Sequence, residues 1–196
     1  MPRTDGQSPG YAADRDERLA AYRWLGFVPI GFLLYAYLSY HRTWELLWIC
    51  NAANLLLAWA LFSASRRLLW LATLCLLVGA PMWLIHLNVR GHFFPHSFLT
   101  HVIAPILGLA LIRGGPRVIG VWKYAFGFGI AVQVLSRAIS PPALNVNVSH
   151  ASYFRGDSIL ANYWVYWLGC ASLIAVTLYG LERAVGRFLA RDKSAR

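Results

Sequence analysis

The chain has 196 residues, of which 58% are hydrophobic, 15% aromatic and only 13% charged. Soluble domains carry about 25% charged residues, so this composition excludes an ordinary water-soluble core and favours an integral membrane protein. The net charge of +10 does not indicate nucleic-acid binding, because the cations stand at the ends of apolar runs and form no single patch. Membrane lipids are the partners that this composition predicts, and no nucleic acid is expected.

A polar segment of mixed charge, residues 1–20, precedes the first apolar run and lacks the apolar core of a cleavable signal peptide. We interpret it as a flexible tail. Six apolar runs follow, each close to the roughly 20 residues that a helix needs to cross hydrocarbon. They are Trp24–Tyr40, Trp44–Phe62, Leu68–Asn88, Ser97–Ile112, Val118–Ser136 and Ser158–Leu181. Because backbone in lipid must satisfy its own hydrogen bonds, we expect an all-α bundle of about six transmembrane helices over 21–185, and a basic tail over 186–196.

Lys and Arg are distributed unevenly between the two sides of this predicted bundle. They concentrate in the N-terminal flank, the second and fourth connections and the C-terminal tail. The other side carries only Arg42, Arg90, Arg137 and Arg155. The positive-inside rule therefore predicts that both termini are cytoplasmic.

All six histidines fall on the predicted outer side. Imidazole is amphipathic and sits well among lipid headgroups, so we interpret His41, His92 and His96 as rim residues. His101 lies deeper, about 6 Å below the rim at 1.5 Å per residue, where ionisable groups usually serve a function. No HExxH motif accompanies the histidines, so we predict no bound metal and no other cofactor, and a metal held by several imidazoles is the weaker alternative.

Cys50 lies in the second run, about 9 Å below the rim. Its depth is therefore comparable with that of His101. The two residues belong to different predicted helices and could meet inside the bundle. The CNAAN segment places Asn54 on the same helix face as Cys50, with Asn51 beside it. A cysteine next to a histidine can act as a nucleophile, with an amide that orients the imidazole or stabilises an oxyanion.

A plainer interpretation exists for each of these side chains. A buried cysteine usually packs as a small hydrophobe, as we expect of Cys75 and Cys170, and asparagine within a span often only bonds to another helix. The three cysteines show no CxxC spacing, so neither a disulfide framework nor a zinc ribbon is expected.

The segment 137–157 (RAISPPALNVNVSHASYFRGD) has two prolines and no helical pattern, which predicts a long ordered or half-inserted loop. Arg137 has the forked donors that suit a lipid phosphate. Asn145 and Asn147 would point the same way in an extended chain and could form a lid over the cavity mouth. The residues that we expect to bind substrate are His86, Arg137, Asn145, Asn147 and His150.

Four short segments carry a resemblance to a known family: WICNAANLLLAWAL, PMWLIHL, HVIAPILGLAL and NVNV before the last run. From about Trp44 to Tyr166 the chain resembles a family of bacterial six-span integral membrane proteins, distantly similar to the YwaF-like transmembrane family. An animal member of the wider family is described as a lipid acyltransferase with a Cys on one span and a His on a later one. The resemblance implies that Cys50 and His101 take those places, and that the membrane is the bacterial plasma (inner) membrane. His86 stands where that family has an acid.

Two functions from different classes follow. In the first, Cys50 is the nucleophile and His101 the general base of an enzyme that transfers or hydrolyses a lipid acyl group through a thioester. Asn51 or Asn54 would orient the base or stabilise the oxyanion. In the second, the chain is not an enzyme, and an outward-facing site senses, binds or carries a small solute or proton through His86 and His101. The absence of a polar path through the inner half and of paired sequence halves disfavours a carrier.

Overall fold

The computed structural model describes residues 16–40, 43–90, 95–113, 115–154 and 156–194. Within these residues every regular element is helical and no strand occurs, which confirms the predicted all-α class. The α-helices are α1 (Glu17–Ala20), α2 (Phe27–Tyr40), α3 (Ile49–Phe62), α4 (Arg66–Arg90), α5 (Pro95–Phe98), α6 (Ala104–Ile112), α7 (Val121–Ile139) and α8 (Tyr163–Ser194). A π-helical turn, η4 (Leu99–Ile103), joins α5 to α6. The remaining turns are the 3-10 segments η2 (Arg23–Gly26), η3 (Thr43–Leu47), η5 (Pro142–Leu144), η6 (Val146–Val148) and η7 (Ile159–Ala161).

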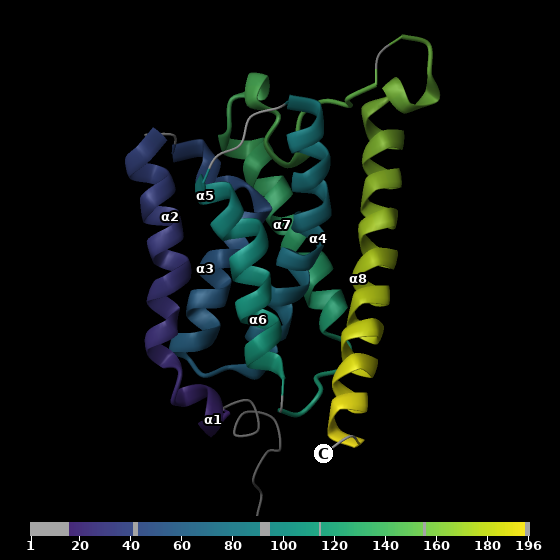
Figure 1. The fold of residues 1–196 in the computed structure, drawn as a ribbon. Coiled ribbons are helices and arrows are strands. Elements are labelled where there is room, and N and C mark those ends of the chain that lie inside the picture. The colour runs from purple at the N-terminus through teal and green to yellow at the C-terminus, as the bar shows by residue number, and fades with distance from the viewer. Residues whose placement is uncertain (1–15, 41–42, 91–94, 114, 155, 195–196) are drawn as a thin grey trace, which may run out of the picture.

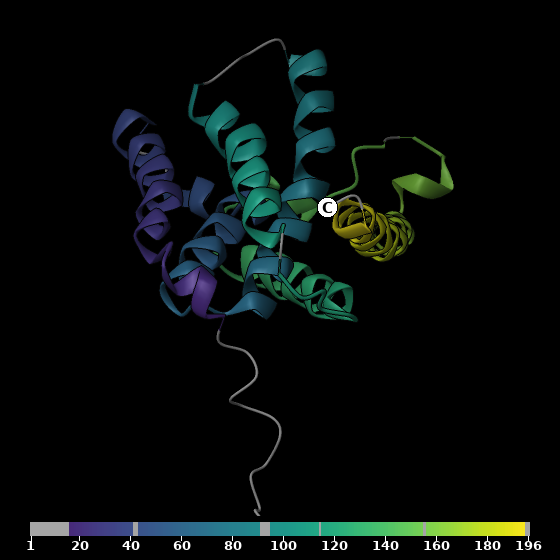
Figure 2. The same ribbon diagram turned by 60° about the horizontal axis from the view of Figure 1, so that its bottom comes forward.

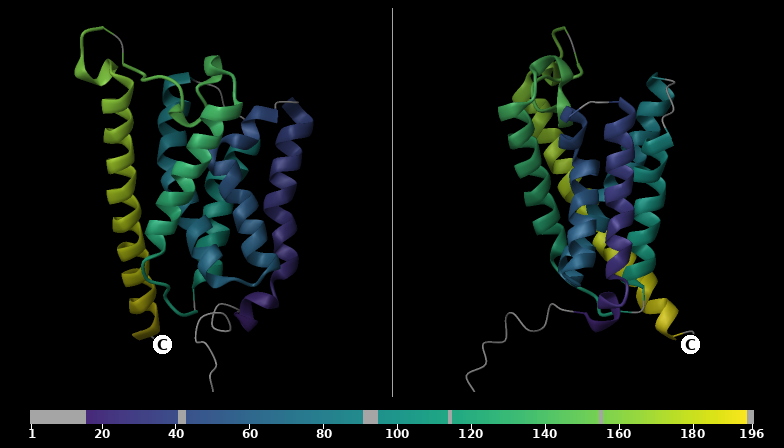
Figure 3. Two further views of the ribbon diagram at one scale, coloured as in Figure 1. Left: turned by 180° about the vertical axis from the view of Figure 1, so that it is seen from behind. Right: turned by 90° about the vertical axis from the view of Figure 1, so that its left-hand side faces the viewer.

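The long helix α4 is the centre of the bundle. It contacts α3, α6, α7 and α8, while α2 and α8 lie at opposite edges (Figures 1 and 3). Leu69, Trp70 and Leu74 of α4 are at most 1% exposed and pack with Leu57 and Leu61 of α3. The core therefore lies mainly between these two helices, and the other helices cover it.

Small residues let the helices around α4 approach closely. A Cβ added at Gly108 of α6 would lie only 2.4 Å from Oγ1 of Thr73 on α4. Thr73 in turn donates a hydrogen bond to the carbonyl of Leu69 in its own helix, at 2.7 Å. Such small-residue contacts are typical of helices packed in lipid, where close backbone approach and not apolar burial holds helices together.

Three helices are long and apolar enough to cross a membrane: Arg66–Ile85, Pro95–Ile112 and Tyr163–Leu189. Of the most apolar window in each, 56% is buried in the first and only 6% in the third, so α4 is enclosed by protein whereas α8 faces outward. Exposed side chains of α8 include Leu173 and Val176, at 67% and 68%. A continuous apolar surface of this kind is unfavourable in water and is compatible with a lipid environment.

Each of the six predicted apolar runs contains a helix, but three of them fall short of a candidate span. The first and second runs form helices of only 14 residues each, α2 and α3. The second is short because Thr43–Leu47 is a 3-10 turn, so the α-helix begins at Ile49. The fifth run, α7, carries polar Lys123, Gln133 and Arg137, and it is not among the helices apolar enough to be a candidate span.

The two predicted tails are partly helical. Residues 16–20 of the predicted N-terminal tail include α1, whose Leu19 is 2% exposed and packs in the core. Within the predicted C-terminal tail, α8 continues to Ser194. The end of α8 and α1 lie at one end of the bundle, hereafter the terminal end, and the loops between α7 and α8 lie at the opposite end (Figures 1 and 2).

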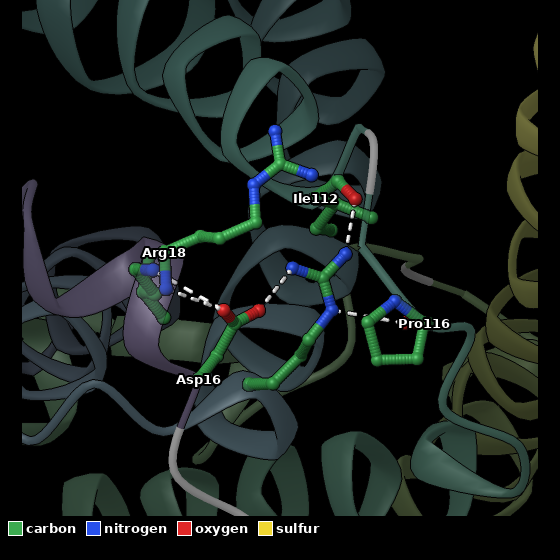
Figure 4. A network of polar contacts seen from close by, with 6 residues as sticks. Asp16, Arg18, Ile112 and Pro116 are labelled. Carbon is green, nitrogen blue, oxygen red and sulfur yellow. Dashed lines mark hydrogen bonds and ion pairs between the residues drawn. The ribbon is translucent and has the colours of Figure 1, made fainter.

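A buried ion pair closes the terminal end. Arg66, the first residue of α4, donates through Nη1 to Oδ2 of Asp16 at 2.9 Å, and the two side chains are 6% and 12% exposed. Arg66 also donates through Nε to the carbonyl of Pro116 at 2.9 Å and through Nη2 to that of Ile112 (Figure 4). Asp16 accepts from the backbone N–H of Arg18 and caps α1. Every donor group of this guanidinium therefore has an acceptor, as a buried charge requires.

A buried carboxylate attaches α8 to α7 at the same end. Glu182 of α8 is 2% exposed and accepts from the backbone N–H of Gly120 at 2.9 Å and of Trp122 at 2.8 Å. These are free donors at the start of α7, where the helix dipole favours a negative charge. The buried carboxylates of Asp16 and Glu182, both at the terminal end, thus hold helices together.

Candidate functional site

Cys50 lies in the first turn of α3, at the end of the bundle opposite the termini. Its side chain is 9% exposed. The helix starts here because Oδ1 of Asn147, from the distant loop after α7, accepts the N–H of Ile49 at 2.9 Å and so caps α3 in place of a local side chain. The contact between α3 and the loop after α7 therefore fixes the position of the thiol.

Gly79 of α4 brings Cys50 and His101 together. A Cβ added at Gly79 would lie 2.4 Å from Sγ of Cys50, 3.7 Å from its Cβ and 3.9 Å from Cδ2 of His101. Both side chains therefore approach the same point on α4, one from α3 and one from η4. No larger residue fits at position 79 without moving the thiol. Cys50 and His101 thus approach each other inside the bundle, as predicted, because both side chains lie against Gly79.

The imidazole of His101 is held by its own helix. Nδ1 lies 2.8 Å from the carbonyl oxygen of Ser97, and because a carbonyl only accepts, Nδ1 carries the proton. In the neutral ring this leaves Nε2 with the lone pair, the arrangement that a general base needs. The residue lies within the π-helical turn η4, where the N–H of Ala104 donates to Leu99. Pro105, four residues after His101, has no N–H to offer the carbonyl of His101.

Trp83 fixes the plane of the same ring. Its indole stacks on the imidazole of His101 with ring centres 5.2 Å apart and an interplanar angle of 5°. Its Nε1 donates to Oγ of Ser97 at 2.8 Å. Trp83 is one turn beyond Gly79 on α4, so one helix face contacts both the thiol and the imidazole.

The two asparagines beside Cys50 differ in their bonding. Nδ2 of Asn54 donates to the carbonyl of Cys50 at 2.9 Å, and the residue is 0% exposed. Its Oδ1 is buried without a hydrogen-bond partner, which is unusual for a native interior. Oδ1 of Asn54 can therefore accept a hydrogen bond from a ligand, while one of the two N–H groups of Nδ2 is bonded to the carbonyl of Cys50. Asn51 is half-buried on the next position of the helix.

The side chains of Asn147 and Asn145 stabilise the loop after α7 through hydrogen bonds. Both have positive φ, 54° and 44°, which asparagine tolerates better than most residues. Nδ2 of Asn147 donates to the carbonyl of Leu47 at 2.7 Å and to Oγ of Ser136 at 2.8 Å. Oδ1 of Asn145 accepts the N–H of His150 at 2.9 Å. The extended conformation expected for this segment is wrong, since the 3-10 turns η5 and η6 replace it and the two amides point to different partners. Their role in binding substrate stays a prediction.

Arg137 and His150 lie at the α8 side of the same loop. Arg137 donates through Nη1 to the carbonyl of Ser149, and its guanidinium lies over the ring of Tyr163. Nε2 of His150 lies 3.4 Å from Oγ of Ser140. Neither residue contacts the Cys50 site through these bonds.

The other predicted histidines lie mostly outside the described residues. His86 lies in α4, and its side chain is outside the described part of the structure, as are His41 and His92 altogether. His96 is half-buried in α5. Among the described residues no three His, Cys, Asp or Glu side chains gather as metal ligands would.

The sequence analysis missed Gly79, Trp83, Gln133 and Ser136. Gln133 donates to the carbonyl of Asn147 at 2.9 Å and accepts from Nε1 of Trp167 at 2.8 Å, which ties the loop to α7 and α8. A glycine within an apolar helix is a signal for close approach, and it could have identified Gly79.

Comparison of the chain with protein-family models, with curated proteins and with solved structures finds no match.

Proposed function

We propose that the chain is a membrane-embedded enzyme that transfers or hydrolyses acyl groups of membrane lipids, with Cys50 as nucleophile and His101 as general base. The observation that carries this proposal is the approach of both side chains to Gly79. The imidazole tautomer supports it, because Nε2 has the lone pair that can take the thiol proton.

The proposed reaction has two steps. His101 takes the thiol proton through Nε2, and the sulfur of Cys50 attacks the carbonyl carbon of a lipid ester. Collapse of the tetrahedral intermediate breaks the ester C–O bond, and the imidazolium returns the proton to the departing alcohol, leaving an acyl thioester on Cys50. An acceptor alcohol or water, deprotonated by the same imidazole, then attacks the thioester, and the thiol leaves with that proton.

The asparagines take distinct roles in this proposal. Oδ1 of Asn54 accepts the hydroxyl of the incoming alcohol, since that atom has no protein partner. The amide of Asn51, or the second N–H of Asn54 Nδ2, stabilises the oxyanion, because only one N–H of Asn54 is bonded to the carbonyl of Cys50. The carbonyl of Ser97, and not an amide, orients the base.

The site belongs at the outer leaflet of a bacterial plasma membrane in a six-span arrangement. The charge bias of the sequence favours a cytoplasmic position for the terminal end, and the start of α3, which carries Cys50, lies at the opposite end of the bundle (Figure 1). The short apolar helices at Arg23–Leu38 and Ile49–Phe62 would join the three candidate spans by thinning the bilayer or by packing against longer neighbours, and α7 would be the sixth span.

The test is the acyl thioester itself. Purified protein in nanodiscs is incubated with a phospholipid bearing a fluorescent acyl chain, and peptides of Cys50 are examined by mass spectrometry for a hydroxylamine-sensitive acyl group. Cys50→Ala should abolish labelling and turnover, and His101→Ala should slow turnover by about 10²- to 10⁴-fold. Cys170→Ala is the matched control and should retain activity. Labelling that survives Cys50→Ala refutes the proposal.

The burial of the thiol favours a second candidate. With Cys50 only 9% exposed, the sulfur can serve packing against Gly79 alone. The imidazole of His101 would then bind a solute or proton in a sensor or binding protein. Binding or signalling that depends on His101 and is indifferent to Cys50→Ala identifies this function.

A further inference from the structure

Arg137 forms an aromatic-stacked cation at the junction of α7 and α8. Its guanidinium carbon lies 4.9 Å from the ring centre of Tyr163 and 5.6 Å from that of Trp164. Nη1 donates to the carbonyl of Ser149, which also accepts the hydroxyl of Tyr163 at 2.8 Å. The side chain is therefore fixed in direction although it is exposed.

Most of the donor capacity of this guanidinium is unused. Among the described residues only the carbonyl of Ser149 accepts from Arg137, so Nε and Nη2 have no acceptor in the part of the chain that the structure describes. The ion pair between Arg66 and Asp16 lies at the terminal end, and no described carboxylate pairs with Arg137. An exposed, oriented and uncompensated guanidinium fits a bidentate anion, above all a phosphate.

The surroundings favour a lipid as the source of that phosphate. Tyr163 and Trp164 begin α8, as aromatic residues do at a membrane interface. One turn further from the loop, towards the middle of the bundle, Val134 of α7 and Leu168 of α8 are 60% and 58% exposed. An acyl chain below the headgroup would therefore meet apolar side chains on both helices.

We propose that Arg137, held by Tyr163 and Trp164, binds the phosphate of an anionic phospholipid whose acyl chains lie along Val134 and Leu168. The contacts of Arg137 go to the loop and to α8, whereas Cys50 is enclosed by α3, α4 and η4. This lipid site is thus separate from the Cys50 site and does not rest on the proposed acyl chemistry.

The experiment measures the first bound lipid by native mass spectrometry of the full chain in an uncharged maltoside detergent, at fixed low ionic strength. The probes are short-chain phosphatidylglycerol, phosphatidylcholine with the same acyl chains, the matching diacylglycerol and inorganic phosphate. Phosphatidylglycerol should bind tightest, and Arg137→Gln should weaken its binding by about 10- to 100-fold, as expected for a charge-assisted bidentate contact. Arg137→Lys keeps the charge without the fork and should weaken binding less.

The control is Arg67→Gln, which removes a cation at the terminal end that also lies over a ring, 6.0 Å from the centre of Tyr124. It should leave the affinity for the first phosphatidylglycerol within about twofold, the range of an exposed charge. Equal losses in Arg67→Gln and Arg137→Gln overturn the proposal, because they indicate general charge attraction. Equal affinity for phosphatidylcholine or for inorganic phosphate overturns the anionic-lipid assignment. Alkylation of Cys50 should proceed at the same rate in Arg137→Gln, which shows that the variant is folded and keeps this test apart from that of the acyl chemistry.

Discussion

Gly79→Ala tests the contact on which the candidate site depends. The added Cβ would meet Sγ of Cys50 at 2.4 Å, whereas its distances to Cβ of Cys50 and Cδ2 of His101, 3.7 and 3.9 Å, are ordinary contacts. Sulfur is therefore the atom that must move. Forcing a methyl group into packed interior costs about 1–3 kcal/mol, while replacing Gly by Ala within a helix gains up to about 1 kcal/mol. The net expectation is a loss of roughly 0–2 kcal/mol in the free energy of unfolding.

A double-mutant cycle isolates this contact from helix propensity. Cys50→Ala removes the sulfur, so Gly79→Ala in that background should stabilise the protein by up to about 1 kcal/mol. The coupling energy between the two positions should then be about 1–3 kcal/mol, the cost of overpacking alone. Thermal or denaturant unfolding of the detergent-solubilised protein measures all four corners of the cycle.

Gly127→Ala in α7 is the matched control, because nothing lies within 4 Å of a Cβ added there. It should stabilise the protein in both backgrounds, with no coupling to Cys50. If Gly79→Ala behaves like this control, the thiol does not lie against Gly79, and the approach of Cys50 to His101 loses its basis. The rate of alkylation of Cys50 should also change in Gly79→Ala and not in Gly127→Ala.

Two further predictions concern the ends of the bundle. Arg66→Gln should destabilise the protein by about 3–5 kcal/mol, because it leaves the buried carboxylate of Asp16 unpaired; thermal unfolding measures this, and the exposed neighbour Arg67→Gln should change stability by less than about 0.5 kcal/mol. Asn147→Ala should cost about 1–3 kcal/mol, since it removes the cap of α3 and two donated bonds. Hydrogen exchange at the Ile49 amide should speed up in Asn147→Ala, and Asn88→Ala, an exposed side chain bonded only within α4, should leave both stability and exchange unchanged.

The positions of the helices follow from apolar runs alone, because a chain in lipid has few alternatives to a helix over such runs. Their lengths do not. The run from Trp44 looks continuous, yet the α-helix begins only at Ile49, where Asn147 supplies a cap from far along the chain. A boundary set by a tertiary contact leaves no local signal in the sequence.

The approach of Cys50 to His101 could be anticipated, because helical rise fixes depth once the ends of the runs are known. Which side chains would surround the pair could not. Gly79 and Trp83 belong to α4, and their role depends on how that helix is rotated in the bundle. The orienting acceptor is a backbone carbonyl, which every residue has and no composition reveals.

In the loop after α7, a local sequence pattern predicts a conformation that the structure does not have. LNVNV alternates as a strand does, but Asn145 and Asn147 adopt left-handed conformations and bend the chain into 3-10 turns. Asparagine tolerates this region because its short side chain can bond locally to the backbone. Asn147 bonds to α3 and α7, whereas Asn145 bonds to His150 and Ala151 within the loop.

Packing alone accounts for part of the Cys50 site and not for the rest. A small thiol against Gly79 is an ordinary way for two helices to approach. It gives no reason for a stacked Trp83, for the hydrogen bond from that indole to Ser97, or for the bond from His101 to the carbonyl of Ser97. These three contacts restrain the rotation, plane and tautomer of one imidazole, and a histidine that only filled space would not need all three. The same face of α4 thus holds the imidazole in a defined orientation near the thiol, and the proposed nucleophilic reaction would need this preorganisation.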